Sequence, residues 1–244
     1  LMVICSGHDA GGGPGSGPNG YLFAIQTDGT LRIKTQDSGA GTNGDALGLG
    51  SNLNDNNWHH LVVTWQANTT NGRNIYLDGE LVRQSNTGAS NAWRNTAQSL
   101  LYIGAMWNQQ QNAFDSNAWW NGEIDDFRLL RKILSPTEVR EIYCKDVTLT
   151  TPSNYWDGSS TTAQISSDTL NIRGGTADIA GGKYSPALNF SGTNNASITP
   201  SSEFDFSSDA TLAFWMKDPD TPKVSSEGSG DYWWQVLRSD QGSG

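Results

Sequence analysis

A strand followed by a clearly signalled helix, at Trp120–Tyr143, constrains the fold of this chain more than any other stretch. Its first part, Gly122–Leu130, has the apolar and aromatic density of a β-strand and carries several acids. The second part has the signals of a helix N-terminus. Ser135 is the expected N-cap, Pro136 takes the first helical position, and Glu138 follows the serine by three residues as a capping box. We therefore expect a short helix that closes this stretch.

The rest of the chain alternates short apolar runs with turns. Two hairpins are predicted, one around Asp28 and Gly29 and one around Asp78 and Gly79, because Asp-Gly suits tight two-residue turns. The run WHHLVVTW at Trp58–Trp65 reads as a further strand. Many short strands with a single helix after them predict an all-β sandwich or jelly roll.

Composition agrees with this fold class and limits the partners. Of 244 residues only 16% are charged and 28 are Gly, which is typical of turn-rich extracellular β-domains. The net charge of −10 disfavours nucleic acid and anionic membranes as partners, and is compatible with divalent cations. No apolar run is long enough to predict insertion into a membrane.

Sequence blocks in both parts of the chain resemble a laminin-G-like domain of the concanavalin A-like jelly-roll superfamily. The second half of such a domain is similar to NWHHLVVTW, IYLDGELV, LYIG and NGEIDDFRLLRKILSPTEVREIY. The first half is similar to YWDG, SPALNFSG, ASITPSSEFDFSSDATLAFWMK and WWQVLRSD. The resemblance spans nearly the whole chain and implies a concanavalin A-like sandwich with one short C-terminal helix per domain. The second half, however, comes first in this chain.

Two domain organisations explain the reversed order. In the first, residues 1–145 are the C-terminal portion of one jelly roll, 146–154 are a linker, and 155–244 are the N-terminal portion of a second. In the alternative, residues 1–244 form one circularly permuted domain. If separate chains complete one another instead, the contact is heterologous and would build a fibre.

The two ends of the sequence favour the tandem arrangement. WQVLRS at 234–239 and LMVICS at 1–6 read as the same strand. A single closed domain has only one place in its sheet for that strand, so the two segments would compete.

The resemblance also raises the question of catalysis. Related glucanases carry a Glu-x-Asp-x-(x)-Glu strand whose carboxylates act as nucleophile and acid/base. Glu123 and Asp125 begin such a pattern, but Phe127 and Arg128 stand where the last Glu would be. An arginine cannot act as a general acid at ordinary pH. We predict that the chain is not an enzyme.

The same acids are candidates for a structural calcium ion, which takes several oxygen ligands. The laminin-G-like resemblance implies Asp157 in YWDG together with Asp125 and Asp126 in EIDDF. Strand alternation places Asp125 and Asp126 on opposite faces, so we prefer Asp126 as the ligand. The alternative is that these acids bind neighbouring backbone or arginine.

A ligand surface is predicted at Trp107 and Trp119, which flank a loop rich in Asn and Gln. Aromatic faces stack on sugar rings, and amide side chains bond hydroxyl groups. The alternative is that Trp119 covers an edge of the sandwich, while Trp120 is expected in its core.

Taken together, these features predict a non-catalytic laminin-G-like module of a large extracellular, surface or fibre protein, serving adhesion or assembly. Its partners would be a glycan, an extracellular protein or neighbouring copies of the same domain. The alternative function is a carbohydrate-binding, lectin-like module. Such a module could be attached to a glycan-degrading enzyme. The expected location is extracellular or the cell surface, with a virion or appendage as the alternative. Cys5 and Cys144 could form a disulfide or remain buried thiols.

Overall fold

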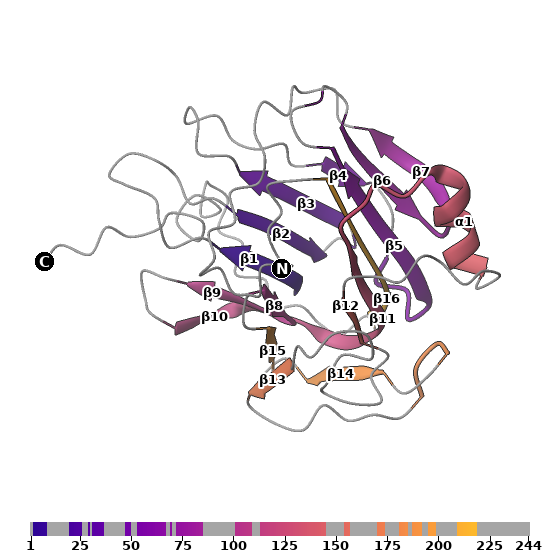
Figure 1. Cartoon of the computed structure of the whole chain (residues 1–244). Coiled ribbons are helices and arrows are strands. Elements are labelled where there is room, and N and C mark those ends of the chain that lie inside the picture. Colours follow the sequence, from indigo (N-terminus) through magenta and orange to yellow (C-terminus); the bar gives the residue numbers. More distant parts are fainter. Residues whose placement is uncertain are drawn as a thin grey trace, which may run out of the picture.

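A computed structural model gives the chain a β-sandwich architecture with one helix among its described residues (Figure 1). The described residues are 2–8, 20–25, 29, 31–36, 47–49, 53–66, 69, 72–84, 101–108, 113–144, 154–156, 170–173, 181–184, 187–191, 195–198 and 209–218. Three predicted features lie outside them: Asp157, Asp28 in the first predicted turn and the strand WQVLRS at 234–239.

The strands follow one another as short elements. They are β1 (Met2–His8), β2 (Gly20–Ile25), β3 (Leu31–Gln36), β4 (Leu47–Leu49), β5 (Trp58–Trp65), β6 (Arg73–Leu77), β7 (Glu80–Gln84), β8 (Leu101–Ile103), β9 (Ala105–Asn108), β10 (Ala113–Trp119), β11 (Asn121–Leu130), β12 (Asn154–Trp156), β13 (Leu170–Arg173), β14 (Leu188–Ser191), β15 (Asn195–Ile198) and β16 (Ala210–Lys217). Helix α1 is Pro136–Cys144. The predicted hairpin at Asp78 and Gly79 is confirmed, since it joins β6 to β7.

Two antiparallel sheets form the layers of the sandwich. The first sheet has the order β13-β15-β8-β1-β2-β3-β4. The second has the order β12-β11-β16-β5-β6-β7, with β14 also paired to β11. A separate ribbon of β9 and β10 lies beside β1 and β8 (Figure 1). This arrangement confirms the predicted all-β sandwich.

Both sheets combine strands from the two parts of the chain. In the second sheet, β16 lies between β11 and β5 and is hydrogen-bonded to both. In the first sheet, β15 lies between β8 and β13. Strands β12 to β16 therefore share the two main sheets with strands of the first part of the chain. Whether the two parts belong to one domain or to two stays a prediction.

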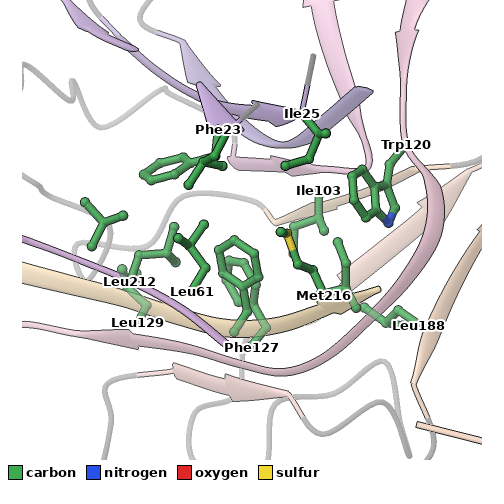
Figure 2. Packing of buried hydrophobic residues seen from close by; sticks show 14 of the residues in the cluster. Phe23, Ile25, Leu61, Ile103, Trp120, Phe127, Leu129, Leu188, Leu212 and Met216 are labelled. Carbon is green, nitrogen blue, oxygen red and sulfur yellow. The ribbon is translucent and has the colours of Figure 1, made fainter. Parts of the chain in front are cut away.

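The core between the sheets is built from aromatic and branched aliphatic side chains (Figure 2). The first sheet contributes Phe23, Ile25 and Ile103, which lie on one side of the core in this view. Leu61 and Phe127 face them from the second sheet. Trp120, expected in the core from the sequence, is also part of this cluster and fully buried.

Helix α1 covers the outer face of the second sheet. A second apolar cluster joins the helix to that face: Val62, Tyr76, Leu130, Leu134, Val139, Ile142 and Ala213. The predicted capping box is present, because Glu138 Oε2 accepts from the Ser135 backbone N–H at 2.8 Å and the Glu138 N–H donates to Ser135 Oγ at 3.3 Å. The helix prediction is confirmed.

Cys144, at the end of the helix, is an exposed free thiol, so it forms no disulfide with Cys5 and is not buried.

In the part of the chain that the structure describes, no helix combines the length and the apolar character that crossing a membrane requires.

Candidate functional site

Strand β11 carries the candidate acids, and its backbone contains a bulge at Asp126. The pairing with β16 advances three residues on β11, from Asp125 to Arg128, for two on the partner. Asp126 is the extra residue and has a φ of 54°, an angle that Asp tolerates better than most side chains. A bulge re-aims side chains, so strict alternation does not hold across this segment. The prediction that Asp125 and Asp126 point to opposite faces is therefore wrong.

Both carboxylates lie on the outer face, the side that carries α1. Asp125 is opposite Trp215, whose ring stacks on Tyr143 of the helix with centroids 5.5 Å apart. The Asp126 side chain binds Arg128. Arg128 is opposite Ala213, which belongs to the second apolar cluster, under α1.

Arg128 binds Asp126 with a two-pronged ion pair. Its Nε donates to Asp126 Oδ1 at 3.0 Å and its Nη2 donates to Oδ2 at 2.8 Å. The two side chains are 15% and 5% exposed, so the pair is largely shielded from water. Parallel bonds of this kind are the strongest arginine–carboxylate geometry. Arg128, at one of the two positions where the glucanase pattern would have its last Glu, therefore neutralises the neighbouring acid.

The other two acids of the strand also have partners within the protein. Asp125 is buried and its Oδ2 accepts from the Tyr184 backbone N–H at 3.0 Å. Glu123 Oε2 lies 3.4 Å from Lys217 Nζ, on the neighbouring strand β16. Asp125 thus binds the segment that carries Tyr184 to β11, and Glu123 binds β16 to it.

These contacts bear on the predicted calcium site. Among the described residues, no group of three or more His, Cys, Asp or Glu side chains is arranged to hold a metal ion. Asp126 presents both of its oxygens to Arg128, and Asp125 is directed at the Tyr184 backbone. The described donor set therefore does not fit a calcium ion while the ion pair is formed. Asp157 lies outside the described residues, and calcium binding stays a prediction that melting with and without a chelator tests.

The predicted ligand surface falls on the ribbon of β9 and β10. Trp107 pairs with Phe114, and Trp119 pairs with Ala105, which is two residues before Trp107 on the same strand. The ribbon thus brings the two tryptophans, which are separated by 11 residues in the sequence, onto adjacent strands. The Trp119 side chain is partly exposed. Residues 109–112, which are Gln and Asn, lie between these strands in the sequence and outside the described residues.

A histidine held between two carboxylates was not anticipated from the sequence. His59 Nδ1 lies 2.9 Å from Asp78 Oδ2 and its Nε2 lies 3.2 Å from Asp55 Oδ1. Asp78 Oδ1 also accepts from the His60 backbone N–H at 2.8 Å. The network ties the segment before β5 to the turn between β6 and β7. The available signal was Asp78 itself, since an Asp at a hairpin turn often bonds nearby groups.

The neighbouring His60 has the opposite environment. It is 2% exposed, and its ring packs against Trp215 and Tyr143 with centroids 4.9 and 5.9 Å away. Burial, with a smaller effect from Arg128 that Asp78 opposes, lowers the pKa of His60 to about 3. For His59, the hydrogen bond to Asp78 and the further one to Asp55 outweigh burial and raise the pKa above its usual value.

These two histidines predict a stability maximum near neutral pH. The contribution of His59, whose pKa is raised, is complete below about pH 6.5 and is lost as pH rises through its folded pKa. His60, whose pKa is lowered, destabilises the fold as pH falls from about 6.5 towards 3, because the unfolded chain then binds an extra proton.

Urea unfolding across this range checks the prediction with two variants. His60→Phe should flatten the acid side of the stability profile, and His59→Gln should flatten the alkaline side. If His59→Gln leaves the alkaline side of the profile unchanged, the assignment of the two environments is contradicted.

Comparison with known families now bears on the chain as a whole. A laminin G family model, described as the concanavalin A-like lectin/glucanases superfamily, matches residues 4–140. The matched region is more than half of the chain. The chain belongs to the concanavalin A-like lectin/glucanase superfamily. No curated protein and no solved structure shows a significant match.

The match includes the acidic strand and most of the helix of this superfamily member. It begins in β1 and ends within α1, so Glu123, Asp125 and Asp126 all lie inside it. Residues 154–218 lie beyond the match, although they contribute strands to both sheets.

Proposed function

We propose that this chain is a non-catalytic laminin-G-like module of a larger extracellular, surface or fibre protein, and that it serves adhesion or assembly. The observation that supports this most is that the acidic side chains of strand β11 already have partners within the protein. All three of its acids are engaged by the protein: Glu123 by Lys217, Asp125 by the Tyr184 backbone and Asp126 by Arg128. A retaining or inverting glycosidase needs two carboxylates facing the substrate, one of them able to donate a proton.

Incubation with β-glucans tests the non-catalytic part of this proposal. We expect no release of reducing ends by the wild-type chain. Hydrolysis that is lost in Glu123→Gln but kept in Glu80→Gln, a matched change on the exposed strand β7, would contradict the proposal.

Carbohydrate binding is the second candidate function, and the ribbon of β9 and β10 favours it. The register brings Trp107 and Trp119 onto adjacent strands of the ribbon that lies beside β1 and β8 (Figure 1). Tryptophan faces are suited to stacking on sugar rings, and the Trp119 side chain is partly exposed.

A glycan array separates the two candidate functions. If the ribbon binds sugar, Trp107→Ala and Trp119→Ala should each weaken binding about tenfold or more, which corresponds to about 1.4 kcal/mol. The matched control is Leu81→Ala, which removes an exposed apolar side chain from β7, in the second sheet. Specific glycan binding that is unaffected by either tryptophan change would exclude the ribbon as the sugar site.

A further inference from the structure

We infer that residues 154–218 complete the sandwich of residues 1–144 in the same chain, by filling a slot between β11 and β5. In the second sheet, β11 and β5 are not hydrogen-bonded to each other. Each instead pairs with β16, and all eight residues of β16 have a partner on β5. Without β16, the slot would have two unpaired strand edges facing one another across the middle of a sheet.

The side chains of β16 match both faces of this slot. Leu212, Phe214 and Met216 join the core between the sheets. On the outer face, Ala213 packs under α1 and Trp215 packs against His60. A strand that is buried on both faces in this way belongs at the centre of a sheet.

Polar contacts fix the register of β16 in the slot. Thr211 Oγ1 donates to the Lys132 carbonyl at 2.6 Å and accepts from the Leu134 N–H at 3.1 Å, just before α1. At the other end of the strand, Lys217 meets Glu123 across the β11 pairing. These two anchors lie at opposite ends of β16, so a shift by one residue would break both.

The first part of the chain also has glycines where the second part approaches closely. A Cβ on Gly104, whose φ is +82°, would lie 2.4 Å from Phe190 Cδ1 of β14. A Cβ on Gly122 would lie 2.4 Å from the Lys217 carbonyl oxygen. A side chain at Gly104 would collide with Phe190, and one at Gly122 would collide with the Lys217 backbone. The two parts are therefore complementary in shape as well as in hydrogen bonding.

The connection between the two parts favours completion within one chain. Helix α1 ends at Cys144 and β12 begins at Asn154, where it pairs directly with Leu129 of β11. A segment tethered by a connection of this length has an effective concentration on the order of millimolar at its site. At micromolar protein, a segment from a second copy cannot compete with that unless the connection prevents closure. The closed permuted monomer is thus the expected form.

A cross-strand disulfide tests this inference on the full chain. Glu123→Cys and Lys217→Cys are combined in a Cys144→Ser background, because these positions are paired neighbours on the surface. We expect a disulfide within one chain, seen as a monomer on non-reducing electrophoresis and as one linked peptide pair by mass spectrometry. The two single-cysteine variants control for reaction with Cys5. Disulfide-linked dimers or ladders, or two free thiols, would overturn the inference.

A second measurement needs no substitution. A carbodiimide joins Glu123 to Lys217 directly in the wild-type chain. Equal amounts of ¹⁴N- and ¹⁵N-labelled chains are unfolded and refolded together before this reaction. Closure within the chain predicts linked peptides that carry a single isotope. Mixed-isotope pairs would show that the segment is exchanged between copies, and absence of the linked pair would show that β11 and β16 are not neighbours.

Discussion

Replacing Phe214 by alanine is expected to lower the free energy of unfolding of the whole sandwich by about 3–5 kcal/mol. Phe214 is fully buried on β16 and stacks on Phe127 of β11, with ring centroids 5.8 Å apart. The change leaves a cavity at the point where the two parts of the chain meet. Urea unfolding followed by tryptophan fluorescence measures the effect.

The matched control for Phe214→Ala is Leu81→Ala on β7. Leu81 is 49% exposed, so its truncation should change stability by less than about 0.5 kcal/mol. An equally small effect of Phe214→Ala would mean that β16 does not occupy the central position between β11 and β5.

Arg128→Ala is expected to be the second large effect, with a loss of about 3–5 kcal/mol, because it leaves a buried carboxylate without its partner. Asp126 is 5% exposed in the pair and cannot recover its hydration by turning outward without moving the bulge. The combined variant Asp126→Asn with Arg128→Gln removes both charges and should be more stable than Arg128→Ala alone. Urea unfolding of Asp126→Asn alone, of Arg128→Gln alone and of the double variant gives the coupling energy of the pair.

An exposed ion pair supplies the comparison for Arg128. Arg140 and Glu80 form a salt bridge between α1 and β7, with side chains 64% and 65% exposed. Arg140→Ala should cost no more than about 1 kcal/mol, since water screens and replaces such contacts. If Arg128→Ala is as mild as Arg140→Ala, the Asp126 carboxylate is not held as a buried ion.

Local signals in the sequence predicted the regular elements well. The helix begins at Pro136 because Ser135 and Glu138 bond reciprocally, and both residues can be read directly from the sequence. The turn at Asp78 and Gly79 was also predictable. Both residues have positive φ angles there, which Asp-Gly tolerates in tight turns. Short-range chemistry decides these features, so a single sequence reveals them.

The candidate site depended on features that pattern alone does not show. An alternating strand gives no warning that Asp126 is an extra residue, because the bulge is defined by the register of the partner strand. The engagement of Asp125 by Tyr184 joins residues 59 positions apart in the sequence. For the same reason, the network around His59 was missed, since its two acids approach from separate segments. Long-range contacts of this kind follow from the packing of the strands rather than from local preference.

Differential scanning calorimetry of the wild-type chain tests the central claim, that both parts of the chain build one sandwich, most directly. We expect a single transition whose calorimetric and van't Hoff enthalpies agree, because β16 and β15 join the two parts in both sheets. The same single transition should move down in Phe23→Ala, in the first part, and in Phe214→Ala, in the second. Two separate transitions, each responding to only one of these changes, would contradict the account.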